Sequence, residues 1–235
     1  MSLTTVSVVV PLLNEEKALP KFLTDLQMLE GAEILLVDGG STDGTWQLLG
    51  RWLGTLPYRA HRGKQLLRTD CGRGRQMNEG ARKATGEILL FLHVDSTFPV
   101  KGLDALRQAL ERPDVVGGAF RLKIDATHPV LKFIERMANF RARFLKLPYG
   151  DQGLFVRRDL FERLGGYSTL PLMEDVDLIR RMKQMGKVVL LQEAIVTSPR
   201  RWIREGIYYT TFRNLALISL YFIGVSPRTL AKWYR

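Results

Sequence analysis

The sequence predicts an α/β fold in which a mostly parallel central sheet is flanked by helices. The strongest observation is the run Ile88–His93, in which five of six side chains are apolar. A short apolar run of this kind is typical of a strand that is buried on both faces of a parallel sheet. The second observation is that similar runs alternate with segments of helical periodicity, which indicates βαβ units with right-handed crossovers.

The first half of the chain supplies most of the predicted parallel strands. One apolar run ends at Pro11, and apolar residues then recur at helical spacing. The turn-rich loop Asp38–Gly44 separates a second buried strand from the helix that follows it. The expected elements are strand Val6–Val10, helix Leu19–Leu29, strand Ile34–Val37, helix Thr45–Leu53, a weak strand Gln65–Leu67, a helix that ends near Thr85, and strand Ile88–His93.

The second half is predicted to be more mixed. Gly117 and Gly118 suggest a bend or a close backbone approach within one strand. We find no internal repeat, low-complexity segment or linker in the 235 residues, so we expect one domain. The expected elements are helix Leu103–Leu110, strand Val115–Ile124, helix Pro129–Leu147, strand Gly153–Val156, helix Asp175–Met185, strand Lys187–Leu191 and an apolar helical tail, Trp202–Phe222.

The chain is basic, with 35 Lys and Arg, 24 Asp and Glu, and a net charge of +11. Such an excess favours anionic partners, such as nucleotide phosphates or phospholipid. Residues 200–235 hold seven cations and one acid, Glu205, for which a solvated basic face is the alternative explanation. Nucleic-acid binding is disfavoured, because the cations are interleaved with carboxylate motifs and no RNA-stacking signature is present.

The apolar tail is too short to cross a bilayer. Leu215–Val225 is only eleven residues long, and Arg213 and Ser226–Pro227 bound it. A membrane span needs about 20 apolar residues. The tail is therefore predicted to be either a buried core helix or an interfacial helix.

Polar residues follow several of the predicted strands. Asp95 and His93 follow the run at Ile88, Asp38 follows the second strand, and Glu15 follows the first. Ligands bind at the carboxyl edge of such sheets, where a carboxylate can hold a divalent cation against a phosphate. The alternative for Asp38 and Asp95 is a capping or turn role.

Two further groups can carry chemistry. Arg73 and Arg75 can pair with phosphate oxygens through their planar guanidinium groups, or can simply be solvated. Glu174, Asp175 and Asp177 open a predicted helix, where the helix dipole favours them. One of these acids can instead be a general base for an acceptor hydroxyl. The glycine fingerprint of dinucleotide-binding folds is missing after the first strand, and no Walker-A pattern is present.

Six motifs occur in order along most of the chain. They are S-V-V-V-P-L-L-N-E-E (Ser7–Glu16), L-V-D-G-G-S-T-D-G-T (Leu36–Thr45), R-Q-M-N-E-G-A (Arg75–Ala81), A-T-G-E-I-L-L-F-L-H-V-D (Ala84–Asp95), G-D-Q-G-L-F-V-R-R (Gly150–Arg158) and M-E-D-V-D-L (Met173–Leu178). In this combination the chain resembles the family 2 inverting glycosyltransferases, more narrowly a bacterial subgroup of small stand-alone enzymes. The resemblance implies a Rossmann-like GT-A fold with a nucleotide-binding half over residues 1–96, an acceptor half over 97–200 and a helical tail over 201–235.

The resemblance also implies a reaction and its residues. A hexose would move, with inversion, from a UDP- or GDP-sugar to an acceptor hydroxyl, assisted by Mg²⁺ or Mn²⁺. Asp175 would be the general base with Glu174 beside it, and Asp95 would bind the metal. Contacts to the donor are expected from Pro11, Glu15, Asp38, Arg73, Arg75, His93 and Asp95. Contacts to the acceptor are expected from Asp151, Gln152, Arg201 and Trp202.

Three positions depart from the family pattern. Gly39 stands where a second acid commonly follows the second strand, and Ser198 stands in place of the glutamine of a Q-x-x-R-W motif. His93 replaces the first acid of the D-x-D metal motif, so metal binding would rest on Asp95 alone, with His93 facing the diphosphate. Gly39 and His93 motivate a second hypothesis, a catalytically silent nucleotide- or anion-binding protein on the same fold.

The tail also bears on partners and location. Its aromatic and aliphatic residues lie among cations, which is how a protein binds an anionic bilayer. We therefore expect a peripheral enzyme with a lipid-linked acceptor, while core closure or a homodimer contact remains the alternative. The single cysteine, Cys71, and the lack of a basic N-terminal signal region favour a cytoplasmic location, peripheral on the inner face of the membrane.

Overall fold

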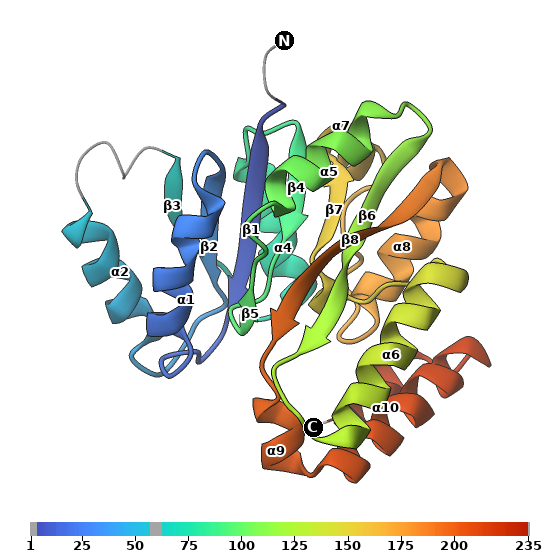
Figure 1. Cartoon of the computed structure of the whole chain (residues 1–235). Helices are drawn as coiled ribbons and strands as arrows, with labels where there is room; N and C mark the ends of the chain where they lie inside the picture. The colour runs from blue at the N-terminus through green and yellow to red at the C-terminus, as the bar shows by residue number, and fades with distance from the viewer. Residues whose placement is uncertain (1–3, 57–62, 235) are drawn as a thin grey trace.

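The computed structural model describes residues 4–56 and 63–234. The described residues form a sheet of eight strands in the order β3-β2-β1-β4-β7-β6-β8-β5 (Figure 1). Neighbours from β3 to β4 are parallel, as are β6 and β8, whereas β7 is antiparallel to both β4 and β6. The strands are β1 (Val6–Leu12), β2 (Glu33–Asp38), β3 (Lys64–Arg68), β4 (Ile88–Phe91), β5 (Ser96–Thr97), β6 (Val115–Ile124), β7 (Leu154–Arg157) and β8 (Lys187–Thr197).

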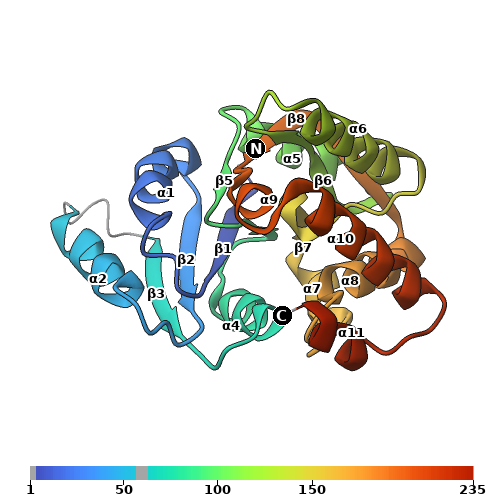
Figure 2. The same ribbon diagram turned by 90° about the horizontal axis from the view of Figure 1, so that it is seen from below.

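Helices cover both faces of this sheet (Figures 1 and 2). The α-helices are α1 (Leu19–Asp25), α2 (Thr45–Thr55), α4 (Arg73–Lys83), α5 (Gly102–Glu111), α6 (Pro129–Phe144), α7 (Arg158–Arg163), α8 (Glu174–Met185), α9 (Arg200–Glu205), α10 (Ile207–Phe222) and α11 (Pro227–Tyr234). The described part of the chain also contains two short 3₁₀ helices, Leu26–Leu29 and Gly150–Gln152. The predicted mostly parallel α/β architecture with a helical tail is confirmed.

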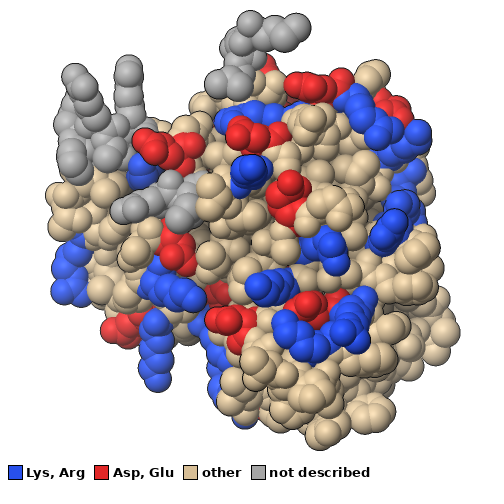
Figure 3. All heavy atoms as spheres, in the orientation of Figure 1, with Lys and Arg blue, Asp and Glu red and all other residues tan. Residues whose placement is uncertain are grey.

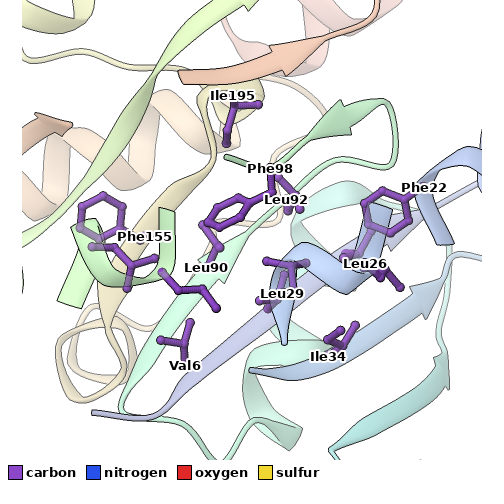
Figure 4. Close-up of a cluster of buried hydrophobic side chains, with 14 of the residues drawn as sticks. Val6, Phe22, Leu26, Leu29, Ile34, Leu90, Leu92, Phe98, Phe155 and Ile195 are labelled. Carbon is purple, nitrogen blue, oxygen red and sulfur yellow. The ribbon is translucent and has the colours of Figure 1, made fainter. Parts of the chain in front are cut away.

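Side-chain alternation in the strands creates a core on each face of the sheet. In β1, Val8 and Val10 belong to a cluster with α1, α2 and α5, whereas Val9 faces a second cluster with α4, α7 and α8. Figure 4 shows part of the first cluster, in which Leu26 lies between Phe22 and Ile34 in this view. Helices packed on both faces hold the buried strands in place. The site residues that follow the carboxyl ends of these strands are therefore positioned by the core.

Several boundaries differ from the sequence prediction for local physical reasons. The strand predicted to reach His93 ends at Phe91, because a turn closed by the Ser96 amide and the His93 carbonyl follows it. The helix predicted over Leu19–Leu29 ends at Asp25 and continues as a 3₁₀ turn. Strand β8 runs on to Thr197, since it pairs with β6 along its length and with β5 at its end.

The tail is broken and only partly buried. The predicted continuous helix from Trp202 is interrupted at Gly206, whose φ of 90° is favourable for glycine. Of the two alternatives for this segment, the buried core helix is wrong. In α10, Thr210 and Leu217 are buried, whereas Phe212 and Leu215 are exposed. Within the described residues, every helix is too short or too polar to cross a membrane.

A glutamine joins the ends of the first two strands. The Gln76 amide nitrogen donates to the Leu12 carbonyl at 2.7 Å and to the Val37 carbonyl at 2.9 Å. A Cβ atom on Gly39 would lie 2.8 Å from the Gln76 side chain. Gly39, which stands where the resemblance predicts an acid, thus lies at a position where Gln76 already fills the space.

Candidate functional site

A cavity of about 240 Å³ lies beside the ends of β4 and β8. Helices α8, α10 and α11, which supply much of its lining, lie together in Figure 2. The fold brings eight sequence-predicted site residues into this lining from five parts of the chain. They are Arg73, His93, Asp95, Asp151, Glu174, Asp175, Arg201 and Trp202.

The two predicted catalytic acids begin helix α8. Met173, the residue before them, has a φ of 68°, an uncommon conformation for a residue with a side chain, and such conformations cluster at functional sites. Asp175 accepts hydrogen bonds from the Gly150 amide at 2.7 Å and the Val176 amide at 2.8 Å. Both carboxylate oxygens are thus held in place, and each retains a lone pair that can accept a proton.

Glu174 is the more buried of the two acids. Its Oε1 lies 3.5 Å from a guanidinium nitrogen of Arg73, at the start of α4. Burial raises the pKa of Glu174, an effect that Arg73 opposes and the neighbouring Asp175 charge reinforces. Arg73 is half exposed, so it can pair with Glu174 and still present nitrogens to an anion in the cavity.

His93 and Asp175 approach each other across Gly150. A Cβ atom at Gly150 would lie 3.3 Å from Asp175 Oδ2 and 3.5 Å from His93 Nε2. His93 Nε2 is buried and has no hydrogen-bond partner among the described residues. Burial, and then the charge of Arg73, lowers the pKa of His93 to about 4, so the imidazole is neutral at physiological pH.

Asp95 is linked to Glu15 through a residue that sequence reasoning left out. One nitrogen of Arg200 lies 2.7 Å from Glu15 Oε2 and 3.6 Å from Asp95 Oδ2. Burial raises the pKa of Glu15, against the hydrogen bond and charge of Arg200. Arg200 precedes the predicted Arg201 and Trp202 in the same R-R-W motif, and that adjacency is the sequence signal for it.

Asp151 lines the cavity with an unsatisfied oxygen. Its Oδ1 is buried without a hydrogen-bond partner among the described residues. Burial raises the pKa of Asp151 to about 6, although Arg141 opposes the shift; the charge of Asp175 adds to it. A carboxyl group in this state can exchange a proton near neutral pH.

We expect Asp151→Asn to stabilise the protein at about pH 8 and to lose that advantage near pH 4. The folded-state pKa of about 6 lies above the ordinary value of 3.8, so the ionised carboxylate disfavours folding above pH 6. This destabilisation of the folded state disappears as the pH falls from about 6 to 3.8, because the Asp151 carboxylate becomes protonated over that range. It amounts to at most roughly 3 kcal/mol. Thermal unfolding of both proteins at the two pH values tests this; an equal difference in Tm at both contradicts it.

Gln152 does not reach the cavity. It is fully buried and accepts from the Tyr149 amide and from Arg141, while its own amide donates to the Phe120 carbonyl. The predicted contact between Gln152 and an acceptor is therefore wrong, because its polar atoms are used to hold this turn against β6. Tyr149, which Arg141 covers at 3.3 Å from the ring centre, lines the cavity instead.

A separate open hollow lies next to two further predicted donor residues, Asp38 and Arg75. It is lined by Gly39, Gly40, Arg68, Thr69, Asp70 and Cys71. Asp38 is buried beneath it and binds the Gly40 and Ser41 amides and the Arg68 guanidinium, at 3.2 Å from Nε. Arg75 pairs with Asp70 at the rim, 3.7 Å away. Pro11 lies in β1, in register with Val37. These residues are thus not in the cavity lining, and direct contact with Asp38 requires Arg68 to move.

The tail supplies cavity residues that the sequence prediction missed. Tyr234 hydrogen-bonds Arg201 through its hydroxyl, and the guanidinium groups of Arg201 and Arg213 lie over its ring. Glu205 pairs with the same two arginines. Thr210, Asn214, Leu217 and Ile218 complete this wall. No motif marks them, since their place depends on how the tail folds back.

The donor set fits a divalent metal that is shared with a substrate. The described residues contain no cluster of three or more His, Cys, Asp or Glu side chains able to hold a metal by themselves. Mg²⁺, however, is commonly bound by one or two carboxylates together with substrate phosphates. Asp95 offers one carboxylate, and neutral His93 offers a nitrogen that lacks a partner. The residues present are therefore sufficient only together with an anionic ligand.

Comparison with known proteins decides the family. The model of glycosyl transferase family 2 matches residues 7–165, about two thirds of the chain. The chain belongs to this family. A glycosyltransferase of Mycobacterium bovis named for PGL/p-HBAD biosynthesis is 31% identical over 178 residues, and the match covers 69% of this chain and 62% of the relative. This family 2 chain therefore spans less than two thirds of that relative's length.

A second relative matches a shorter part of the chain. The undecaprenyl-phosphate 4-deoxy-4-formamido-L-arabinose transferase of Aeromonas hydrophila is 30% identical over 131 residues, and the match covers 52% of this family 2 chain and 38% of the relative.

Solved structures confirm the GT-A fold of this family 2 chain. A mannosyltransferase from Pyrobaculum calidifontis, solved with GDP-Man and Mn²⁺, has a TM-score of 0.63 and 23% identity, and the match covers 82% of this chain and 56% of that one. S. aureus TarS residues 1–349 with UDP have a TM-score of 0.65 and 16% identity, covering 96% and 68% respectively. The predicted Rossmann-like GT-A architecture is therefore correct.

Proposed function

We propose that this family 2 chain transfers a hexose from a nucleotide-diphosphate-sugar to an acceptor hydroxyl with inversion. The observation that carries the proposal is the cavity in which Asp175, at the start of α8, faces His93 and Asp95, which follow β4, together with Arg73. Family membership supports sugar transfer as the reaction class. The convergence of a fixed carboxylate with anion-binding groups supports the site.

The proposed roles follow from position and charge. The acceptor hydroxyl is deprotonated by Asp175 as its oxygen attacks the anomeric carbon, and the bond from that carbon to the diphosphate breaks, its electron pair leaving with the diphosphate. The amides of Gly150 and Val176 keep the Asp175 carboxylate oriented. Arg73 pairs with diphosphate oxygens as negative charge develops on them.

Asp95 and His93 would hold a divalent metal, Mg²⁺ or Mn²⁺, beside the diphosphate. When bound, such an ion offsets the charge that develops on the leaving group. Mn²⁺ in the mannosyltransferase structure supports this choice. Arg200 pairs with the Asp95 carboxylate in this structure. A metal ion bound to Asp95 would compete with this ion pair, so Arg200 would move toward the phosphates when the ion is present.

The donor is proposed to be a UDP- or GDP-sugar that extends from the open hollow to the cavity. The start of α4 joins the two, because Cys71 lines the hollow and Arg73 lines the cavity. Structural neighbours solved with GDP-Man, UDP-GlcNAc and UDP support nucleotide binding. Glu15, Asp38 and Arg75 are proposed to contact the nucleoside side of the donor.

The acceptor is proposed to be a lipid-linked molecule, reached by a peripheral enzyme at the inner face of the cytoplasmic membrane. The names of the two curated relatives refer to PGL/p-HBAD biosynthesis and to undecaprenyl phosphate. Asp151, Arg201 and Trp202 line the cavity and are proposed to bind this acceptor.

We expect thermal unfolding to identify the nucleotide. UDP, GDP and dTDP are added separately to the purified chain, each with and without Mn²⁺. A ligand at a hundred times its Kd stabilises the native state by about 2.7 kcal/mol, which raises Tm by roughly 5–10 °C for a chain of this size. Transfer and hydrolysis are then assayed with donors that carry the nucleotide that binds. No shift with any nucleotide contradicts donor binding.

The same assay distinguishes the enzyme from the second hypothesis, a catalytically silent nucleotide- or anion-binding protein. Gly39, which replaces an acid, favours a silent binding protein on this fold. A nucleotide that binds while every donor stays intact, with no hydrolysis or transfer, supports that alternative over the enzyme.

A further inference from the structure

Helix α6 presents an apolar stripe to solvent. Phe133, Met137, Phe140 and Phe144 follow one another at helical spacing, and all four are exposed, Phe133 by 61%. The opposite face of α6 is attached to the sheet, where Asn139 and Glu135 bind the backbone of β6. These hydrogen bonds fix the orientation of α6, and the apolar stripe therefore faces solvent in the folded protein.

Helix α10 presents a second stripe of the same kind. Tyr208, Phe212, Leu215 and Phe222 recur at helical spacing and are exposed, Phe212 by 72%. Both views show α10 beside α6 (Figures 1 and 2), and Ile134 and Ile207 pack on one small cluster between them. We call the exposed stripes of α6 and α10 the two-helix surface.

The surface is uncharged over its centre and positive at its edges. Figure 3 shows a broad area with few charged atoms over α6 and the helices below it. Exposed cations lie on α6 and just after it (Arg136, Arg143 and Lys146), in α9 (Arg204) and in α11 (Arg228 and Lys232). The acids of α6 and of residues 200–235 are Glu135 and Glu205. Each is ion-paired, Glu135 with Lys132 and Glu205 with arginines of the tail.

We propose that the two-helix surface docks on an anionic lipid bilayer. Aromatic and aliphatic side chains can enter the headgroup region, and the surrounding cations attract anionic lipids. A second copy of the chain fits less well, because a two-fold contact through this surface would bring its cations together. Charge complementarity thus favours lipid over self-association.

Docking would bring α10, which forms one wall of the cavity, against the bilayer. Helix α10 contributes Phe212 and Leu215 to the surface, while Asn214, Leu217 and Ile218 of the same helix line the cavity. The polar head of a lipid-linked acceptor could then enter the cavity while its chain stays in the membrane. This step rests on the proposed function; the docking itself does not.

Vesicle co-sedimentation tests the docking. We expect the purified chain to sediment with phosphatidylcholine vesicles that contain phosphatidylglycerol, to remain in solution with phosphatidylcholine alone, and to be released by salt. The double variant Phe140→Ser, Phe212→Ser should weaken binding at least tenfold, since two aromatic anchors are removed. Its control, Val100→Ser with Met185→Ser, removes two exposed apolar side chains outside α6 and α10 and should bind like the wild type.

A second pair of variants tests the charges. Arg136→Gln with Arg143→Gln should weaken binding roughly 25-fold, because each surface cation contributes about 1 kcal/mol. Arg51→Gln with Lys83→Gln removes two exposed cations from α2 and α4 and should have a much smaller effect. Near-ultraviolet circular dichroism confirms that each variant is folded.

Three outcomes overturn the proposal: no sedimentation with anionic vesicles at low salt, equal losses in the surface and control variants, or a dimer that the Phe140→Ser, Phe212→Ser variant converts to monomer without any vesicle binding. Nucleotide-induced thermal shifts are measured on the same samples. Vesicle binding without a nucleotide shift rejects the proposed function and keeps the docking, and the reverse result rejects only the docking.

Discussion

Asp175→Asn is expected to reduce sugar transfer by at least about 10²-fold while nucleotide binding persists. The loss follows because a neutral amide cannot take the proton of the acceptor hydroxyl, and general-base catalysis is typically worth 10²–10⁴-fold. The amide is nearly the same size as the carboxylate, and its oxygen can still accept from the Gly150 amide. The measurement is kcat with a saturating donor, alongside the thermal shift with the corresponding nucleotide.

Asp177→Asn is the matched control for this variant. It makes the same charge change in the same helical turn, but Asp177 pairs with Arg181 at 2.8 Å and is not part of the cavity lining. We expect its kcat to stay within a few-fold of the wild type. Turnover of Asp175→Asn at the wild-type rate would move the base elsewhere, and Glu174 would be examined first.

Asp95→Ala is expected to abolish the effect of Mn²⁺ on nucleotide binding and to lower transfer roughly 100-fold or more. The variant removes the carboxylate proposed to hold the metal, and a metal ion at a leaving group contributes several kcal/mol to transition-state stabilisation. Calorimetry with the nucleotide, with and without Mn²⁺, measures the coupling directly.

The control for the metal prediction is Asp104→Ala, which removes an exposed acid from α5 that pairs with Arg107. It should retain the wild-type dependence on Mn²⁺. If the wild type itself binds the nucleotide equally well with and without Mn²⁺, the metal role of Asp95 is wrong.

Much of the fold followed from local sequence pattern. Runs such as Val6–Val10 and Ile34–Val37 are strands because they are buried on both faces, and their burial leaves little choice of structure. The antiparallel placement of β7 could not be predicted, since the run Leu154–Val156 has the same composition in either orientation. The tail break at Gly206 was missed because apolar residues resume at helical spacing directly after it.

The site residues that could be predicted are those in motifs directly after a strand or at the start of a helix. Asp95 and Asp175 come together because each stands at the end of a well-defined element. Gln152 was misassigned, since the sequence of a turn does not tell which side chains bind the protein's own backbone. Arg200 and Tyr234 were missed because their contacts join distant segments, and only the folded tail brings them to the cavity.

The link between Gln76 and the ends of β1 and β2 has an evolutionary consequence. Gln76 fills the space where a side chain at position 39 would lie, so a larger residue there requires the Gln76 side chain to move or to be replaced. An acid at position 39 that displaces Gln76 would leave the Leu12 and Val37 carbonyls without this donor. The two positions should therefore change together across related sequences, because each one determines which residues the other can accept.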